Sequence, residues 1–485
     1  MSQDFIEGSG ELGVIDQIFM GIQEREAAGI ATESAKTKLM NLVREKDGVY
    51  VKKTKQVFEA ISNFVLRPIN RIVDADTSSM ELKIILDSGE VFERTFPMDT
   101  LLSLTKFNKV LAHVDPKILF RGTSKDLGEI RNLIGQKAYT TSFVIDCDGL
   151  HKADNGKIVF VARNQVVTKS GQSCSDYVVN TDKIDIQTTL NPRNIITENE
   201  LKELLYPLFH FNALPVAVTI ISYIAVCFLQ EVFRASGIKV GCLILTGEGG
   251  SGKSTTLEKV IQPIFGIPQA ISASYLSEAS LRDQIAACNT IPLIIEEFKA
   301  SKLTKKQYDT ICNMLRSSYD GHMAIKNKGG NGQSIEFRRP LIVVGESAPD
   351  ESAIRERAMK VMFSKAALQA NPEYKASLQY LEQNNAKLSK LGNSLLELAM
   401  IAMEQQSLIA RTHNDFLARQ KASNVSVNSW PDRVQKNFAS AGVGLSLFLL
   451  CCKQLGVEYE NIIQHSVPEM IAALQASFGP VKNFV

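Results

Sequence analysis

The octapeptide at residues 247–254 constrains this chain more than any other stretch, because it matches the pattern G-x-x-x-x-G-K-[ST]. The apolar run at residues 240–246 precedes it and predicts a buried strand. Residues 255–261 follow it and predict the start of a helix. In this setting the glycines let backbone N–H groups turn towards phosphate oxygens, and the helix N-terminus adds the positive end of its dipole. The sequence therefore predicts a strand, a phosphate-binding loop and a helix.

Two side chains of this loop carry specific expectations. Lys253 is expected to reach the β- and γ-phosphates of a nucleotide, and the Ser254 hydroxyl is expected to bind Mg²⁺. The loop alone admits either ATP or GTP, and a glycine-rich turn without nucleotide is the alternative. The predicted nucleotide-binding set is the loop with the residue after it: Gly247, Glu248, Gly249, Gly250, Ser251, Gly252, Lys253, Ser254 and Thr255.

A second expected strand, at residues 291–295, is apolar and ends in Glu296 and Glu297. Beside a phosphate loop, one such carboxylate can hold the hydration shell of Mg²⁺ while the next polarises the attacking water. We assign Glu296 to the metal and Glu297 to the catalytic base. Aspartate is more usual at the first position, and the extra methylene of Glu296 requires a slightly more distant backbone. A strand that ends in two solvated glutamates is the alternative.

A third apolar strand is expected at residues 340–344, and polar residues follow it. A polar side chain there could sense the γ-phosphate, and both Glu346 and Ser347 fit this position. An Arg- and Glu-rich segment comes next, at residues 354–361. An arginine in it could reach a nucleotide on a neighbouring subunit and stabilise transition-state charge. A charged helix face is the alternative.

A hairpin is expected between the second and third strands, around the Gly- and Asn-rich turn at residues 327–332. Lys326 and Lys328 lie at its tip, while Arg338 and Arg339 lie near its base. Lysines on a projecting tip suit contacts with nucleic-acid phosphates that do not read the bases. A solvated surface turn is the alternative.

The order of these parts resembles that of AAA+ replicative helicases of the minichromosome-maintenance-like and superfamily 3 kind. The resemblance covers about residues 201–450, and the segments 344–347 and 432–439 resemble helicases of bacterial phages and mobile elements. It implies that Arg357 is an arginine finger acting on the neighbouring subunit, with Arg355 as the alternative. By the same resemblance, Arg433, within 432–439, is a second sensor arginine.

The resemblance also implies an activity and its partners. We expect an ATP- and Mg²⁺-dependent, ring-forming DNA helicase or translocase, a hexameric homo-oligomer that acts in replication on single-stranded or forked DNA. Loader or replication proteins are further expected partners. One alternative is a regulatory or defence ATPase that assembles on ATP without unwinding DNA. Another is a membrane-anchored ATPase that uses residues 211–229, which are uncharged and long enough to span a bilayer.

The expected fold is α/β, with an AAA+ core whose parallel sheet lies between helices. The expected domains are a helical arm at 1–60, an α+β collar at 61–200, the ATPase at 201–365 and a helical lid at 366–485. The collar is expected to contain a β-hairpin around the turn at residues 87–90.

Net charge, cysteine usage and apolar segments indicate the cellular compartment and the kinds of partner that the chain can bind. The net charge of +2 gives no overall basic field, so any nucleic-acid contact must come from local patches. None of the eight cysteines forms a C-x-x-C pair, which indicates buried thiols in a reducing compartment. The N-terminus does not match a signal peptide, and residues 211–229 lack flanking basic clusters, so a buried core helix is favoured over a membrane span. We therefore expect a cytoplasmic protein without membrane contact.

Overall fold

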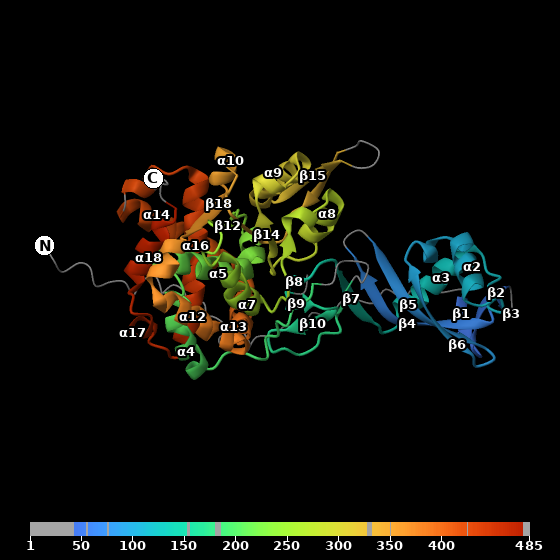
Figure 1. The fold of residues 1–485 in the computed structure, drawn as a ribbon. Coiled ribbons are helices and arrows are strands. Elements are labelled where there is room, and N and C mark those ends of the chain that lie inside the picture. Colours follow the sequence, from blue (N-terminus) through green and yellow to red (C-terminus); the bar gives the residue numbers. More distant parts are fainter. Residues whose placement is uncertain are drawn as a thin grey trace. The chain divides into compact units, whose positions relative to one another are not determined.

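The computed structural model describes most of the chain after residue 42 (Figure 1). The described residues are 43–54, 57–74, 77–152, 156–179, 186–326, 332–349, 351–423 and 425–478. They fall into two compact units. The smaller unit takes the residues up to Asp146 and β11 (Tyr177–Val179), and the larger takes Cys147–Ser173 and the residues after Thr181.

The smaller unit contains a five-stranded sheet in the order β11-β7-β4-β5-β6. Strand β5 alternates between buried and half-buried residues, as expected of a strand with one face on a core. It pairs antiparallel with β6, which confirms the predicted hairpin. Two helices and a 3-10 turn complete this core. Besides β11, the elements of this sheet and the helices beside it are β4 (Phe64–Val73), β5 (Ser78–Leu86), β6 (Val91–Pro97), η1 (Thr100–Leu102), α2 (Leu104–Val114), α3 (Ser124–Gly135) and β7 (Thr140–Ile145).

The described residues between 43 and 60 form strands and a turn, although a helical arm is predicted over residues 1–60. Asp47 and Gly48 turn the chain between the first two strands with φ of 49° and 79°, as an Asp-Gly hairpin turn requires. This turn chemistry and the valines on both sides of it outweigh the mixed charge pattern that suggested a helix. The rest of the predicted arm, residues 1–42, lies outside the described residues. The strands are β1 (Val43–Lys46), β2 (Val49–Thr54) and β3 (Val57–Ala60).

The larger unit is built on a five-stranded sheet in the order β13-β14-β17-β12-β18, and every neighbouring pair of its strands is parallel. Strands β12 and β17 are buried almost throughout, as in a parallel sheet covered on both faces. The α/β class with a parallel sheet is therefore confirmed. The strands are β12 (Cys242–Gly247), β13 (Ile271–Ser272), β14 (Leu293–Phe298), β17 (Leu341–Gly345) and β18 (Ala358–Phe363).

Helices cover both faces of this sheet. One face packs into a large apolar cluster with α4, α5 and the C-terminal helices, and the other packs into a smaller cluster with α8 and α9. Alternate residues of β12 point to the two clusters, because successive side chains of a strand face opposite sides. The helices of this unit before β18, apart from those at residues 253–265, are α4 (Glu198–His210), α5 (Leu214–Ala235), η3 (Ala273–Tyr275), α8 (Glu278–Ala286), η4 (Ala300–Lys302), α9 (Lys305–Asp320) and α10 (Ser352–Arg355).

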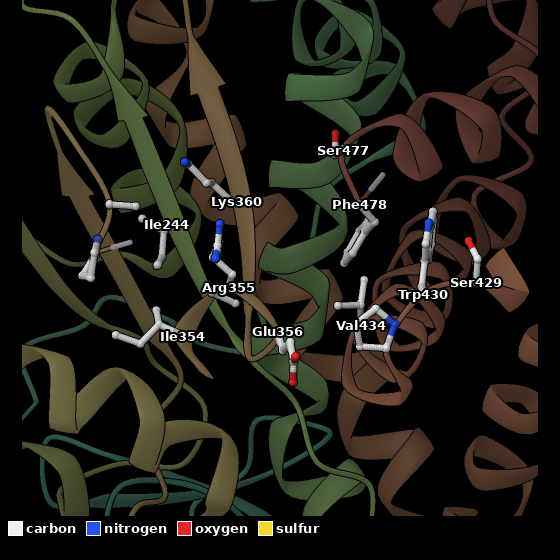
Figure 2. A pocket seen from close by; sticks show the side chains of 14 residues that line it. Ile244, Ile354, Arg355, Glu356, Lys360, Ser429, Trp430, Val434, Ser477 and Phe478 are labelled. Carbon is white, nitrogen blue, oxygen red and sulfur yellow. The ribbon is translucent and has the colours of Figure 1, made fainter. Parts of the chain in front are cut away.

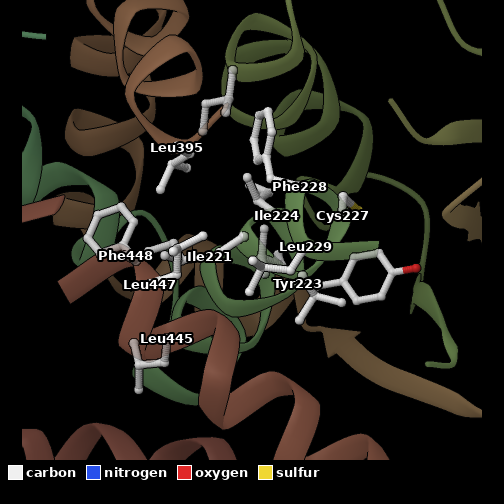
Figure 3. Close-up of a cluster of buried hydrophobic side chains, with 14 of the residues drawn as sticks. Ile221, Tyr223, Ile224, Cys227, Phe228, Leu229, Leu395, Leu445, Leu447 and Phe448 are labelled. Carbon is white, nitrogen blue, oxygen red and sulfur yellow. The ribbon is translucent and has the colours of Figure 1, made fainter. Parts of the chain in front are cut away.

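Two helices among the described residues, α5 and α16 (Asp432–Gln454), are long and apolar enough to cross a membrane. Their most apolar windows are 89% and 83% buried inside the protein. Figure 3 shows their side chains meeting in the large cluster. A Cβ at Gly444 of α16 would lie 2.3 Å from the carbonyl oxygen of Ser222 in α5, so glycine permits this close crossing. Such burial agrees with the core helix expected at residues 211–229.

A three-stranded antiparallel sheet, β10-β9-β8, also belongs to the larger unit, whereas the expected domain boundary lies near residue 200. The Asn289 side chain fixes this sheet to the loop before β14. Its Oδ1 accepts a hydrogen bond from the Leu150 N–H at 2.8 Å, and its Nδ2 donates to the Leu150 carbonyl oxygen at 2.7 Å. The strands are β8 (Gly149–Lys152), β9 (Ile158–Ala162) and β10 (Gln165–Thr168).

The described residues after β18 form helices without strands, which confirms the helical C-terminal region. These helices are α11 (Lys365–Ala370), α12 (Pro372–Gln383), α13 (Asn385–Glu404), α14 (Gln406–Ser423), α15 (Val425–Asn428), α16, α17 (Tyr459–Ile463) and α18 (Val467–Ala476). Several of them share the large cluster with the sheet.

Candidate functional site

The predicted phosphate loop connects the end of β12 to a helical run that begins at Lys253. Gly247, Gly250 and Gly252 have φ of 148°, 76° and 92°, a region that glycine adopts without strain. A Cβ at Gly247 would also lie 2.4 Å from the Phe363 carbonyl oxygen. The predicted strand, loop and helix are all present. The helical run consists of α6 (Lys253–Thr256), the π-helical turn η2 (Leu257–Ile261) and α7 (Gln262–Phe265).

The Lys253 side chain is folded onto this loop. Its ammonium group donates hydrogen bonds to the carbonyl oxygens of Gly247 at 2.6 Å and Glu248 at 2.8 Å, and to Ser251 Oγ at 3.2 Å. The side chain is buried, and that burial lowers its pKa. Ser254 is exposed. The cation therefore lies inside the loop, held by neutral oxygens that an anionic ligand could replace.

The two glutamates of β14 have different surroundings. Glu296 is half-buried, and burial, followed by the charge of Glu297, raises its pKa. Glu297 is exposed and has a φ of 60°, at a bulge that shifts the register of β14 against β17. A left-handed backbone in a non-glycine residue is strained. Ser272 Oγ donates a hydrogen bond to Glu297 Oε2 at 2.6 Å, which fixes the carboxylate that the bulge projects.

The parallel sheet brings three of the predicted positions to its carboxyl edge. Strand β17 lies between β12 and β14, with Gly345 opposite Thr246 on one side and opposite Phe298 on the other. Glu346 N–H donates to the Phe298 carbonyl oxygen at 3.2 Å. The loop after Thr246, the residue Glu346 and the acidic end of β14 therefore lie next to one another.

Glu346 is already paired in the structure. Its Oε2 lies 2.6 Å from the Lys299 ammonium, and the hydrogen bond from Lys299 holds the pKa of this carboxyl below its usual range. Sequence reasoning identified neither Lys299 nor Ser272. The signal for both was positional, because Ser272 ends a strand at this edge and Lys299 directly follows another.

The candidate finger arginines lie at the other end of the sheet. Arg357 directly precedes β18, whose first residue, Ala358, pairs with Cys242 at the start of β12. The last residues of the two strands, Gly247 and Phe363, pair beside the phosphate loop. At about 3.3 Å per strand residue, this separates Arg357 from the loop of its own chain by roughly 20 Å.

Arg357 and Arg355 differ in exposure. The Arg357 side chain is 13% exposed, donates to the Ala353 carbonyl oxygen at 3.0 Å and lies 3.5 Å from the carboxylate of Asp320. Arg355 is exposed. Neither is brought together with Lys253 within this chain.

Arg433 lies at the same amino-terminal edge of the sheet. Its Nη1 donates to Glu356 Oε2 at 3.2 Å. Asn437, one helical turn along α16, donates from Nδ2 to the Glu356 carbonyl oxygen at 3.2 Å and accepts from the Gly241 N–H at 2.9 Å. Arg433 is thus held near the start of β12, and the structure does not place it beside Lys253.

A pocket of about 560 Å³ lies at this edge (Figure 2). Aromatic, aliphatic and charged side chains line it, among them Ile244, Arg355, Glu356, Lys360, Trp430 and Phe478. No phosphate-loop residue lines it, so this pocket is separate from the loop.

The predicted hairpin is present as β15 (His322–Lys326) and β16 (Gly332–Glu336), which pair antiparallel with Lys326 opposite Gly332. Lys328, in the turn, and the side chain of Lys326 lie outside what the structure describes. At the hairpin base, Arg234 Nη1 lies 2.8 Å from Glu336 Oε1 and ties β16 to α5.

The two arginines after β16 have in-chain partners. Arg338 is half-buried, lies 2.8 Å from Glu336 and donates to Cys147 Sγ at 3.2 Å. Arg339 is 7% exposed and donates to the carbonyl oxygens of Ile291 at 3.0 Å and Pro292 at 3.2 Å. Burial lowers the pKa of Arg339 to about 10. Because the guanidinium of Arg339 is buried and donates hydrogen bonds within the protein, we exclude Arg339 from the proposed DNA contacts.

No family model and no curated protein sequence matches the chain. Among solved structures, it is similar to the SCCmec type IV Cch active helicase, with a TM-score of 0.47 and 12% identity over 91% of this chain and 80% of that chain. The JCV helicase gives a TM-score of 0.28 and 15% identity over 51% and 65%. The NrS-1 C-terminal region gives 0.28 and 13% over 84% and 91%. With TM-scores below 0.5, these similarities establish neither a common fold nor a common activity.

Proposed function

We propose that the protein is an AAA+ ATPase that acts as a ring-forming DNA helicase or translocase. One arrangement supports the ATPase assignment: adjacent parallel strands bring Lys253, Glu346 and the pair Glu296 and Glu297 to one edge of the sheet. Strands in a sheet lie about 4.8 Å apart, so the acidic end of β14 lies roughly 10 Å across from the phosphate loop. A gap of this size suits a terminal phosphate and its Mg²⁺.

The oxygen donors at this edge suit Mg²⁺. A nucleotide-borne Mg²⁺ takes one or two protein oxygens and completes its shell with phosphates and water. In this proposal, the Ser254 hydroxyl and the Glu296 carboxylate would hold the ion, which would neutralise charge on the phosphate oxygens. The described residues contain no separate group of three His, Cys, Asp or Glu side chains arranged to hold a metal.

In this proposal, side chains of the loop bind the phosphates, and a side chain of β14 activates the attacking water. Phosphate oxygens replace the carbonyl partners of Lys253, so the ammonium group gains anionic acceptors at the position where it is already held. Glu297 accepts the proton of the attacking water, and Ser272 keeps its carboxylate oriented. Glu346 is the proposed sensor of the γ-phosphate.

Assembly into a ring is proposed from the position of the arginines. Arg357 lies roughly 20 Å from the loop of its own chain, and Arg355 comes two residues before it, so in this proposal each serves a nucleotide on a neighbouring subunit. Such an arrangement requires a head-to-tail oligomer, and an oligomer of this kind forms a ring when its rotation closes. We propose a hexamer in which Arg357, or the more exposed Arg355, completes the neighbouring site. Arg433 has no proposed contact with the nucleotide of its own subunit.

Nucleic-acid contact is proposed for the hairpin β15–β16, through the backbone phosphates of single-stranded DNA and the lysines Lys326 and Lys328. The ion pair between Arg234 and Glu336 anchors the hairpin to the ATPase core, so a shift of that core can be passed to the hairpin. Arg338 contributes through Glu336 to this anchor. A role in replication, with a loader or other replication proteins, and a cytoplasmic location complete the proposal.

The decisive experiment measures ATP hydrolysis with and without single-stranded DNA, together with strand separation of a forked duplex. We expect DNA-stimulated hydrolysis and ATP-dependent unwinding, both absent in Lys253→Ala. Hydrolysis without strand separation or movement on DNA would instead support a regulatory or defence ATPase that assembles on ATP. Absence of ATP binding by the wild-type protein would overturn the proposal as a whole.

A further inference from the structure

Lys299 lies at the catalytic edge of the sheet but has no part in the chemistry proposed above. It follows Phe298, which is paired with Gly345, and its ammonium group lies 2.6 Å from Glu346 Oε2. On the other side of β17, Gly345 pairs with Thr246, just before the phosphate loop. Glu346 is therefore one strand, or about 4.8 Å, from the start of that loop, and Lys299 extends towards it from the end of the next strand, β14.

The charges around Glu346 suggest a function for Lys299. The Glu346 carboxylate is close enough to Lys253 for each group to affect the pKa of the other. A γ-phosphate bound at Lys253 would thus meet a carboxylate of the same sign, and a cation between the two anions would reduce their repulsion. Lys299 already contacts one of them, and an ammonium group has three N–H donors, of which the ion pair uses one. Its side chain is 37% exposed, so the remaining donors are accessible to a ligand.

We propose that Lys299 is a γ-phosphate ligand, held in place by Glu346, through which the protein distinguishes ATP from ADP. This inference rests on the proposed ATPase function. The loop and Lys253 bind the β-phosphate, which ATP and ADP share, and Lys253 also reaches the γ-phosphate. Lys299 contacts the γ-phosphate alone, so it adds affinity for the triphosphate only. When ATP is bound, Lys299 bridges Glu346 and the γ-phosphate, which links the end of β14 to the end of β17. After hydrolysis and phosphate release, Lys299 retains only Glu346.

The test compares the binding of AMP-PNP, which resists hydrolysis, and ADP, each with Mg²⁺, to the wild type and three single variants of the full chain. Lys299→Ala should weaken AMP-PNP binding about tenfold or more, the equilibrium equivalent of about 1.4 kcal/mol, and change ADP binding by less than about twofold. Lys299→Arg keeps the charge and should retain most of the discrimination. Lys302→Ala, the matched control, removes a nearby lysine that affects Glu346 through its charge without a hydrogen bond, and should leave the ratio of the two affinities unchanged.

Each result separates this inference from the proposed function. Wild-type binding of neither nucleotide would overturn both. Wild-type binding with an equal effect of Lys299→Ala on AMP-PNP and ADP, or with no effect on either, would overturn the role of Lys299 and leave the ATPase proposal intact. An equal loss of discrimination in Lys302→Ala would show a general effect of charge and would also overturn the assignment.

Discussion

Ser272 Oγ donates a 2.6 Å hydrogen bond to Glu297 Oε2, and this contact joins the ends of two neighbouring parallel strands. Glu297 has a left-handed backbone at a bulge, so its carboxylate is aimed by the fold and then fixed by a neighbour. A strained residue with a dedicated hydrogen-bond partner at a strand end is typical of a functional position.

We expect Glu297→Gln to bind ATP but to hydrolyse it at least about 100-fold more slowly, since general-base catalysis commonly contributes that factor. Ser272→Ala should lower kcat about tenfold with little change in KM, because the carboxylate remains but is less well oriented. Steady-state ATPase kinetics give both values. Turnover of Glu297→Gln at the wild-type rate would reject the assignment of the base.

Acidification should weaken Mg²⁺-dependent ATP binding through Glu296. Burial and the charge of Glu297 raise the pKa of Glu296, so this carboxyl takes up a proton at a higher pH than an ordinary glutamate. The metal ligand is therefore present above the raised pKa and lost as the pH falls through it. Titration of nucleotide affinity against pH checks this, with Glu296→Gln as the variant that should lose the acid limb. An identical acid limb in that variant would assign the effect to another group.

Mixed assemblies test the arginines. Arg357→Ala and Arg355→Ala are examined separately, and we expect one of them to lower kcat by about 1,000-fold or more, as removal of an arginine finger does. Mixing that variant with Lys253→Ala should restore activity, because hybrid interfaces then contain an intact loop from one subunit and an intact arginine from the other. ATPase rates across mixing ratios measure the recovery. Mixtures no more active than their components would argue against action between subunits.

The hairpin lysines should couple hydrolysis to DNA. The double variant with alanine at Lys326 and Lys328 should keep the basal ATPase rate and lose DNA stimulation and unwinding, because it loses two phosphate contacts. Its affinity for single-stranded DNA should also depend less steeply on salt. A double variant at the exposed residues Lys239 and Lys375, away from the hairpin, is the charge-matched control. Equal unwinding by both double variants would remove the hairpin from the mechanism.

Arg339 should matter for stability. Arg339→Ala leaves buried carbonyl oxygens of Ile291 and Pro292 without a donor, which costs roughly 1–3 kcal/mol for each buried polar group left unsatisfied. We expect a lower thermal midpoint for Arg339→Ala than for Arg338→Ala, since Arg338 is only half-buried. Differential scanning fluorimetry compares the two. A larger effect at Arg338 would contradict this assignment.

The sequence was most informative where chemistry is local. The glycine-rich loop after β12, the strand that contains Glu297 and the two strands of the hairpin follow from short-range patterns, and each of these elements was found where it was predicted. The same reasoning missed β18, because an edge strand that starts directly after the charged residues 354–357 resembles a charged helix. It also misread residues 43–60, where an Asp-Gly turn decided the structure.

Long-range placement was not available from the sequence. Arg433 is expected to be a second sensor arginine, and only the structure shows that it contacts Glu356 at the edge of the sheet opposite to the loop that contains Lys253. Arg339 looked like a basic residue near a hairpin, and only the packing of the strands shows that carbonyl oxygens surround it. The pairing of Ser272 with Glu297 likewise depends on strand order, which no local motif encodes.

The crossing of α5 and α16 at Gly444 has a consequence for dividing the protein. Gly444 brings α16 against the backbone of α5. The C-terminal helices therefore belong to the same hydrophobic core as α5 and the parallel sheet. A fragment ending at residue 365 would leave the apolar surface of α5 facing water. Such a fragment is expected to aggregate, and the sheet and the C-terminal helices should melt together in a single transition.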